Sequence, residues 1–395
     1  MTDAPLVEAR WDAARAALAE AVQPLPAIRL PLADCDGLVL AEDLLARTAL
    51  PAFDTSAMDG WAVAGPGPWT IVGASLAGRP TPAPLRPGQA VVIATGAVVP
   101  AGATAVIRSE DGTVSEDRHT LEASPTPGPS HIRPAGEECA DGELLASHGT
   151  LVTPALIGLA AAAGQDTLSV VSRPRAALVL FGDELATSGI PAPGLVRDSL
   201  GPQVPAWLAR MGVGVVHLER CADTLDEHVE AIHRACAAAD VVLTTGGTAA
   251  GPVDHLHTAI AHNEGRILVD TVAVRPGHPM LAARVGPEST WLLGLPGNPQ
   301  SAIVTLMSLG VPILSGLAGR PPLPELADAV AAEDIPAPPH EDRLVVGTLS
   351  TGVFTPSSHL GSGMLRGLAA ATGFGVLPPG GVRSGDPVRW LPLPA

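Results

Sequence analysis

Three glycine-containing loops in this 395-residue chain carry the residue types that bind an anion. They are "FGDE" (181–184), "TTGGTAAG" (244–251) and "GLPGNPQS" (294–301), and each follows an apolar run. Because glycine has no Cβ, backbone N–H groups in such loops can approach an anion closely, and a helix that follows adds partial positive charge. One such loop is more often an ordinary turn, but three in one sheet favour phosphate binding.

Acidic residues lie in or beside these loops: Asp183, Glu184, Asp198 and Asp254. Carboxylates next to phosphate loops commonly hold Mg²⁺, because a hard cation bridges carboxylate and phosphate oxygens. Asp198 and Asp254 also lie near expected helix starts, where a carboxylate can cap the helix. For these two residues the sequence leaves both roles open.

Two further motifs offer polar groups. "RPGHP" (275–279) places Arg275 and His278 on a tight turn, and a guanidinium recognises oxyanions through paired hydrogen bonds, although a solvated turn is equally compatible with the motif. "FDTSAMDGWAV" (53–63) holds Asp59 in a loop beside apolar strand residues. That loop is either structural or presents Asp59 as a ligand across an interface.

Other metal and catalytic motifs are not found in the sequence. His255, His257 and His262 are spaced so that they do not direct three ligands to one helix face, and the four cysteines show no C-x-x-C spacing. No G-x-S-x-G, Walker-type or complete dinucleotide-binding fingerprint occurs. The scattered cysteines, together with an N-terminus unlike a signal peptide, predict a cytoplasmic protein.

The elements that must position these residues follow from periodicity. We expect a helix over 7–22, a strand pair over 28–48, and a short helix that begins at Thr153-Pro154. Between 175 and 318 buried strands alternate with helices, which predicts a mostly parallel sheet with crossover helices. In such a sheet ligands collect at the carboxyl ends of the strands, where the three loops lie. The expected helices are near 198–211, 224–239, 254–263 and 298–318.

Composition narrows the class of protein. With 46% hydrophobic and 16% charged residues the chain is globular, and its length predicts several domains. A net charge of -17 argues against a nucleic-acid partner. An anionic ligand therefore needs local positive charge, which arginine and helix N-termini must supply because the chain has no lysine. The uncharged stretch 292–319 is long enough to span a membrane, but its prolines and glycines favour a loop and a buried helix, so no membrane insertion is expected.

The motifs form a known pattern when they are taken in order. "FDTSAMDGWAV", "IATGAVVPAGATAV", "IRPAGEE", "RPRAALVLFGDEL", "VRDSL", "TTGGTAAGPVD", "RPGHP" and "GLPGNPQSA" together span nearly the whole chain. With this set the chain resembles the molybdopterin molybdenumtransferases, including the C-terminal domain of gephyrin. The resemblance implies a homodimer that inserts molybdate into adenylylated molybdopterin and releases AMP with the help of Mg²⁺. No membrane or nucleic-acid partner is implied.

The resemblance also implies an α/β multidomain fold. Its centre is a doubly wound, mostly parallel α/β domain of the molybdopterin-binding type over 173–320. The other domains are an elongated N-terminal linker domain (1–50 and 143–172), a β-rich inserted domain (51–142) and a small C-terminal β-barrel (321–395).

Residue roles carry over by motif. Asp59 and Thr95 would come from one subunit and face the sheet of the other, and with Asp254, Arg275 and His278 they form the expected catalytic set. Mg²⁺ would be held by Asp183, Glu184 and Asp254. The nucleotide and the molybdate would be bound by Gly182, Asp198, Ser199, Thr245, Gly246, Gly247, Gly251, Pro296, Gly297, Asn298, Ser301, Arg343 and Ser362.

The chain departs from the family at several of these positions. The usual Lys-Pro-Gly-Lys-Pro turn has Arg275 and His278 in place of the lysines, and a neutral imidazole supplies less charge than an ammonium. Phe181, Leu200 and Ala249 replace polar residues. An alternative function therefore stands beside the enzyme: a catalytically degenerate paralogue that serves as a dimeric scaffold for a protein partner. A third, weaker alternative is an enzyme with a different nucleotide-linked substrate.

Overall fold

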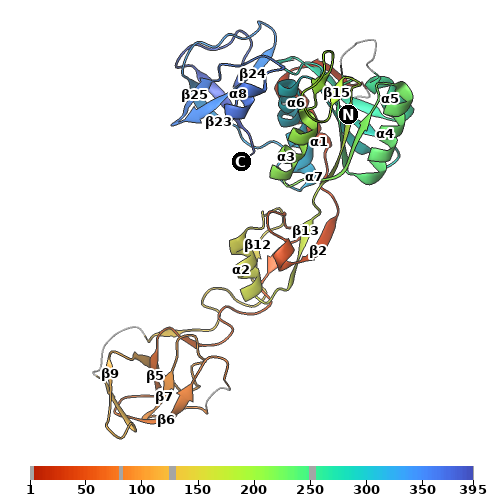
Figure 1. The fold of residues 1–395 in the computed structure, drawn as a ribbon. Helices are drawn as coiled ribbons and strands as arrows, with labels where there is room; N and C mark the ends of the chain where they lie inside the picture. Colours follow the sequence, from red (N-terminus) through yellow and green to blue (C-terminus); the bar gives the residue numbers. More distant parts are fainter. Residues whose placement is uncertain (1–3, 80–82, 124–129, 249–254, 395) are drawn as a thin grey trace. The chain divides into compact units, whose positions relative to one another are not determined.

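The computed structural model describes residues 4–79, 83–123, 130–248 and 255–394. The chain divides into two compact units (Figure 1). Unit 1 comprises Met1–Ile28, Gly37–Val39 and Val171–Ala395, and unit 2 comprises Arg29–Asp36 and Leu40–Val170.

A seven-stranded sheet forms the centre of unit 1 within the described residues. Its spatial order is β1 (Leu6–Ala9), β19 (Arg266–Val272), β21 (Leu281–Val285), β22 (Thr290–Leu295), β18 (Val241–Thr245), β14 (Arg175–Phe181) and β17 (Gly214–Cys221). All neighbouring pairs are parallel except those that β21 makes with β19 and β22. The sheet is therefore mostly parallel, as predicted, with one antiparallel strand that periodicity did not reveal.

Helices cover both faces of this sheet (Figure 1). One face packs on α1 (Trp11–Ala21), α3 (Leu200–Arg210), α6 (Pro299–Thr305) and α7 (Val311–Leu317), and the other on α4 (Leu225–Ala238) and α5 (Leu256–His262). Alternate residues of β14 supply the two cores: Leu178 and Leu180 face one, Val179 and Phe181 the other. Burial on both faces explains why the strands read as continuous apolar runs.

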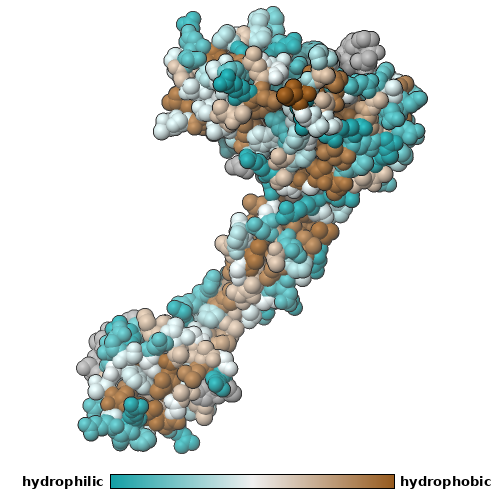
Figure 2. Space-filling view, in the orientation of Figure 1, coloured by the Kyte–Doolittle hydropathy of each residue, from teal (hydrophilic) through white to brown (hydrophobic). Residues whose placement is uncertain are grey.

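The stretch from α6 to α7 is one apolar helical rod with a π-helical turn, η2 (Leu306–Gly310), in its middle. Pro299–Leu317 is 19 residues long and apolar enough to cross a membrane, yet 89% of its most apolar window is buried inside the structure. Both hydrophilic and hydrophobic residues are distributed over the visible surface of each unit (Figure 2). The helix is accounted for as a core element of unit 1.

A small closed sheet ends unit 1. Its strands are β20 (Val274–Arg275), β24 (Asp342–Ser350), β25 (Val353–Pro356), β23 (Ala327–Ala331), β27 (Pro387–Pro392) and β26 (Gly373–Leu377), and β26 pairs again with β24. Phe354 and Trp390 fill its interior, with ring centroids 5.7 Å apart. The helix α8 (Leu365–Ala370) packs against β24. A two-stranded sheet of β15 (Leu185–Ala186) and β16 (Val196–Arg197) completes the unit.

Unit 2 is built mostly from short strands. Its six-stranded sheet has the order β8 (Ala105–Arg108), β5 (Gly60–Val63), β7 (Gln89–Ile93), β6 (Trp69–Ser75), β10 (Thr120–Ala123) and β9 (Gly112–Val114). Two-stranded sheets pair β4 (Thr55–Ser56) with β11 (Ile132–Arg133), β3 (Leu44–Leu45) with β12 (Leu144–Ala146), and β2 (Ala27–Pro31) with β13 (Thr167–Val171). The remaining elements are the short helix η1 (Leu32–Asp34) and α2 (Pro154–Ala162).

Two local predictions are wrong. The helix expected over 7–22 begins only at Trp11, because residues 6–9 form β1 and pair with β19. The strand pair expected over 28–48 does not form, because β2 pairs with β13 and β3 with β12. Both errors have one cause: the true partner strand is distant in the sequence. The start of α2 is confirmed, since the hydroxyl of Thr153 accepts a hydrogen bond from Leu156 N–H at 3.2 Å.

Candidate active site

The three predicted anion loops leave neighbouring strands at one edge of the central sheet. β14, β18 and β22 are adjacent and parallel, and Thr245 lies opposite Leu180 on one side and Leu295 on the other. The first turn residue, Gly246, donates its N–H to the carbonyl of Leu295 at 3.0 Å. The structure thus brings the segments after Phe181, Thr245 and Leu295 side by side.

Glycine is required in the turn after β18. Gly246 and Gly247 have φ angles of +83° and +67°, in the left-handed region that other residues avoid. A Cβ on Gly247 would also lie 3.5 Å from the Cβ of Leu256. The turn at Gly246 and Gly247 therefore has a backbone conformation that favours glycine at both positions. Ala249, Gly251 and Asp254 lie outside the described residues.

The carboxylates Asp183 and Glu184 follow directly after β14. Both are exposed, on the turn that begins at Gly182. Gly182 has a φ of +141°, and a Cβ there would lie 2.7 Å from the Glu184 carboxylate. Within the ranges that the structure describes, no three His, Cys, Asp or Glu side chains are grouped so that they could hold a metal ion. The two carboxylates alone are a partial ligand set.

Asp198 has a different environment from these two. Its side chain is buried, with one oxygen accepting the Gly201 N–H at 2.8 Å and the other accepting from Arg220 at 2.9 Å. Gly201 lies in the first turn of α3, so the structure favours helix capping between the two roles left open for Asp198. Ser199 occupies the N-cap position of α3 without a capping hydrogen bond from its side chain.

The turn after β20 carries the two predicted oxyanion ligands. Arg275 lies opposite Arg343 in the register of β20 and β24, which places two guanidinium groups on neighbouring strands. Arg275 donates from Nε to Glu341 at 2.9 Å, and Arg343 donates to the carbonyl of Pro336. Arg275 remains about half exposed.

The start of α6 lies against this turn. A Cβ built on Gly277 would be 3.4 Å from the Ser301 carbonyl, so the turn and the helix are in close contact. Ser301 is buried, whereas Gly297 and Asn298 before the helix are exposed and Pro296 is buried. The N–H of Gln300 donates to the Ser362 carbonyl at 2.9 Å, which fixes the loop containing Ser362 to the helix. Arg275, Ser301, Arg343 and Ser362 therefore belong to one neighbourhood.

His278 is held by a carboxylate from the other end of the chain. Its Nε2 lies 2.7 Å from Glu8 Oε1 on β1, and the imidazole is about three-quarters buried while Glu8 is mostly exposed. Glu8 in turn donates its backbone N–H to the hydroxyl of Thr271 at 3.0 Å. Arg275 and His278 of the 275–279 turn thus each have their own carboxylate partner, Glu341 and Glu8.

Asp59 and Thr95 meet in unit 2. Asp59 Oδ1 accepts both the backbone N–H of Thr95, at 2.7 Å, and its hydroxyl, at 2.9 Å. These bonds, the backbone one first, hold the pKa of Asp59 below its ordinary value of 3.8. Gly60 follows at a φ of +152°, where a Cβ would lie 1.9 Å from the Ile107 carbonyl. The glycine of the "AMDG" motif therefore permits the β5–β8 pairing that places Asp59 at the strand end.

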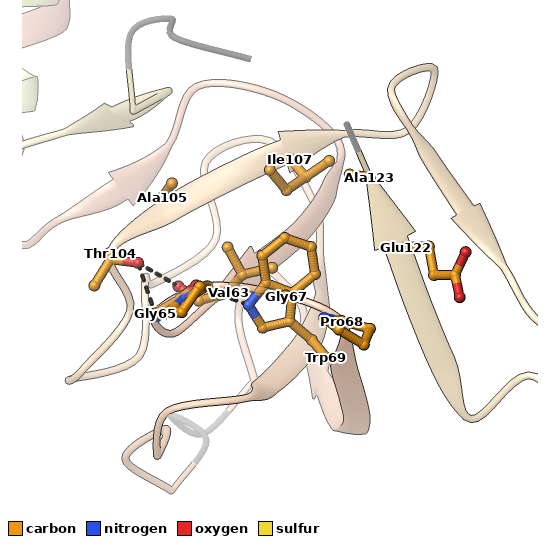
Figure 3. A pocket seen from close by; sticks show the side chains of 11 residues that line it. Val63, Gly65, Gly67, Pro68, Trp69, Thr104, Ala105, Ile107, Glu122 and Ala123 are labelled. Atoms are coloured by element: carbon orange, nitrogen blue, oxygen red, sulfur yellow. Dashed lines mark hydrogen bonds between the residues drawn. The ribbon is translucent and has the colours of Figure 1, made fainter. Parts of the chain in front are cut away.

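A hollow of about 500 Å³ also lies in unit 2, and Figure 3 shows its lining. The Trp69 indole forms part of the wall and donates to the carbonyl of Gly65 at 2.9 Å, while Thr104 accepts the Gly65 N–H at 3.1 Å. No residue predicted for the site lines this hollow. It is separate from the Asp59–Thr95 pair.

Comparison with known proteins gives the family. The MoeA N-terminal region (domain I and II) matches residues 9–164, a probable molybdopterin binding domain matches 177–316, and the MoeA C-terminal region (domain IV) matches 328–393. Molybdopterin molybdenumtransferase 2 of Mycobacterium tuberculosis is 35% identical over 320 residues, 75% of this chain and 78% of that protein. The chain belongs to the molybdopterin molybdenumtransferase family. It is an enzyme of molybdenum cofactor biosynthesis.

Other members of the molybdenumtransferase family cover more of the chain. The molybdopterin molybdenumtransferase of Bacillus subtilis is 31% identical over 374 residues, 89% of this chain and 86% of its own length. A crystal structure of the MoeA protein of Pyrococcus horikoshii has a TM-score of 0.82 at 23% identity and covers 98% of this chain and 99% of its own. At that identity the likeness shows the fold, which is the multidomain α/β fold predicted from the motifs.

Phe181 and Leu200, at which the chain departs from the molybdenumtransferase motifs, have side chains buried in the core. Phe181 is buried and stacks on the His228 ring with centroids 3.6 Å apart, and His228 meets His255 edge-on at 5.5 Å. Leu200 is buried at the start of α3 among the residues that pack on α1. Both side chains pack in the interior and place no bulk over the loops.

Sequence reasoning missed the charged partners of three predicted residues. Glu8, Glu341 and Arg220 bind His278, Arg275 and Asp198, and none of the three belongs to a recognised motif. Glu8 precedes His278 by 270 positions. The only available signal was charge, because each predicted site residue pairs with a residue of the opposite kind, and local spacing in the sequence cannot identify that residue.

Proposed function

We propose that the enzyme binds adenylylated molybdopterin across the loops after β14, β18 and β22, inserts molybdate into its dithiolene, and releases AMP. The observation that supports this most directly is the convergence of three glycine-containing loops on the edge of the sheet where Arg275, Arg343 and the start of α6 also lie. The backbone N–H of Gly247, in a turn without side chains, suits phosphate, and the guanidinium groups suit a tetrahedral oxyanion.

The residues of this edge fit Mg²⁺ as well. Asp183 and Glu184 are exposed, and their carboxylates accept no hydrogen bond within the part of the chain that the structure describes. Mg²⁺ prefers one or two carboxylates, substrate phosphate and water. Asp183, Glu184 and Asp254 would hold it. When bound, the cation would neutralise phosphate charge as AMP leaves. Gly182 and Gly246 keep the backbone uncovered for that phosphate, and Arg275 with Ser301 orients the molybdate.

Calorimetry tests the proposal. Titration of AMP with Mg²⁺ and titration of molybdate into the full chain should each show binding, and Asp254→Ala should abolish the AMP signal. Arg275→Ala should weaken molybdate roughly ten- to a hundredfold, because a charged hydrogen-bond donor is lost. Arg79→Ala removes an equal charge from an exposed position in unit 2 and serves as the control. No binding of either ligand would contradict the proposal.

We also propose that the enzyme is a homodimer in which unit 2 contributes residues to the active site of the partner subunit. Asp59 and Thr95 of one subunit would face the Arg275 region of the other, so every site would need two chains. Mixing Asp59→Asn with Arg275→Ala protein should then restore about a quarter of wild-type activity, since half of the dimers are mixed and each has one intact site. If both residues served a site within one subunit, mixing would restore nothing.

The second candidate is the degenerate scaffold. The burial of Phe181 and Leu200, which replace polar family residues, favours it because those polar groups are gone from the loops. A chain that binds neither AMP nor molybdate but retains a specific protein in pull-down would support the scaffold. Turnover of adenylylated molybdopterin would exclude it. We further propose a cytoplasmic location for either form, in keeping with its four free cysteines.

A further inference from the structure

We propose that Glu8 is a positioning residue of the oxyanion site: it fixes His278 so that molybdate binds only to the imidazolium form and takes up a proton when it binds. The inference rests on the proposed function, because it assumes that the 275–279 turn receives the oxyanion. It concerns a residue that lies outside every recognised motif of the chain.

The argument starts from the 2.7 Å contact between His278 Nε2 and Glu8 Oε1. A carboxylate can only accept a hydrogen bond, so Nε2 must carry a proton. In the neutral ring the other nitrogen, Nδ1, is then bare and is itself an acceptor. Molybdate oxygens are acceptors too, so the neutral ring and the anion would present lone pairs to each other.

Protonation of Nδ1 removes this conflict. A proton from solvent on Nδ1 gives an imidazolium that donates to Glu8 from Nε2 and can donate to an oxyanion from Nδ1. Glu8 stabilises this form as a counter-charge, and it keeps Nε2 occupied so that the ring cannot turn the same N–H toward the anion. Binding of the anion therefore draws one proton into the site.

Other charges around the turn already have partners. The titratable or charged groups on the surrounding elements are Glu8 and Arg10 near β1, Arg266 and Asp270 on β19, Arg275 on the turn, and Glu341, Asp342 and Arg343 at β24; α6 has none. Arg10 pairs with Asp342 at 3.1 Å, Asp270 with His257 at 3.0 Å, and Arg275 with Glu341. Within the described residues Glu8 is the ionised partner of His278.

Arginine makes the opposite side of the turn insensitive to pH. The Arg275 guanidinium stays charged throughout the pH range of the experiment. Its pair with Glu341 therefore affects the net charge of the site, but Arg275 neither takes up nor releases a proton when the anion binds. Glu341 and Glu8 are thus two carboxylates, from different elements, that each contact one residue of the same turn. Only the one that faces an imidazole should couple anion binding to proton uptake.

The test is the pH dependence of molybdate affinity, measured by calorimetry on the full chain from neutral pH upward, in buffers of different ionisation enthalpy. Wild-type protein should lose molybdate affinity as the pH rises and should take up a proton when molybdate binds. Glu8→Gln should flatten this dependence, because the amide can donate to Nε2 and leave a neutral ring with Nδ1–H. His278→Lys should abolish proton uptake, since the ammonium is already charged.

Glu341→Gln is the matched control, expected to change affinity but to keep the wild-type proton uptake. Nitrogen NMR of the histidine ring keeps the test independent of activity: wild type should show the Nε2–H tautomer and Glu8→Gln a mixture. Binding of molybdate with no pH dependence, or with equal proton uptake in wild type and Glu8→Gln, would overturn the inference alone. Absence of molybdate binding in wild type would overturn the proposed function and the inference with it.

Discussion

Asp59 shows how one residue is tuned by two hydrogen bonds from a single neighbour. The backbone N–H and the hydroxyl of Thr95 both donate to the same carboxylate oxygen and favour its charged form. The pKa of Asp59 is therefore lowered, and the backbone bond is the larger cause. An exposed carboxylate that stays ionised at low pH suits a residue expected to meet a polar ligand.

Thr95→Val removes the hydroxyl but keeps the backbone N–H. The pKa of Asp59 should rise only part of the way toward 3.8, because the larger cause remains. A group with a depressed pKa stabilises the folded state above its unfolded pKa and loses this contribution as pH falls through the folded value. Carbon-detected NMR of the carboxyl measures the shift, and Asp117, whose pKa is lowered by Ser115 and His119, is the internal reference. A full return to 3.8 would show that the hydroxyl dominates.

Two cysteines of unit 1 should be inert. Burial raises the pKa of Cys221 to about 12, helped by Glu219, and burial raises the pKa of Cys236 to about 11. At pH 8 roughly one Cys221 in ten thousand is then a thiolate. Alkylation should be very slow in folded protein and rapid in urea. Glu219→Gln should lower the pKa of Cys221 but leave it above 9.0, since burial is the first cause; fast labelling of folded wild type would contradict this.

At the scale of elements, the end of β14 serves both the core and the site. Phe181 anchors the strand end by stacking on His228 of α4, and the next residue, Gly182, opens the first loop. Strand and loop are thus joined without a flexible spacer. The same holds for Thr245 and Gly246 on β18.

Phe181→Ala should cost about 3–5 kcal/mol of unfolding free energy, because a buried ring leaves a cavity between β14 and α4. Chemical denaturation measures the loss. Ile190→Ala is the control, since Ile190 is 97% exposed and its removal should change stability by less than ~0.5 kcal/mol. A small effect at Phe181 would mean that the site collapses around the smaller side chain.

Most strands of the central sheet of unit 1 were predicted from the sequence, but which strands pair with one another was not. "RAALVLF" and "DVVLTT" are apolar runs that end at glycine turns, and parallel order alone places their loops together. β1 was predicted as helix because an alanine-rich segment follows it, and in the described part of the chain it pairs with β19, about 260 residues further along the sequence. The pairing of Glu8 with His278 depends on that same long-range register. The residue types of the candidate site could therefore be read from the sequence, but its ion pairs could not.

At the scale of the whole molecule, the two units should unfold separately. Each has its own core: Val91 and Ile93 help to fill one in unit 2, and Leu178 and Leu243 one in unit 1. Multidomain chains commonly depart from a single cooperative transition. Gly60→Ala, with its Cβ 1.9 Å from a carbonyl, should lower the unfolding temperature of unit 2 alone.

Scanning calorimetry compares the variants. Phe181→Ala should shift only the transition of unit 1, and Gly60→Ala only that of unit 2. A fragment of residues 29–170 examined beside the full chain would identify the transition that belongs to unit 2. If both variants moved a single common transition, the units would be one cooperative body.

The rod from Pro299 to Leu317 has a consequence for handling the protein. Its apolar surface is kept from water by the sheet and the barrel. An exposed segment of this length and composition would be as hydrophobic as a membrane-spanning helix. When heat unfolds the surrounding structure, this apolar segment becomes exposed and associates with the same segment of neighbouring molecules. Thermal denaturation should therefore end in precipitation. Slow removal of urea from dilute unfolded protein should recover more folded enzyme than cooling after heat denaturation.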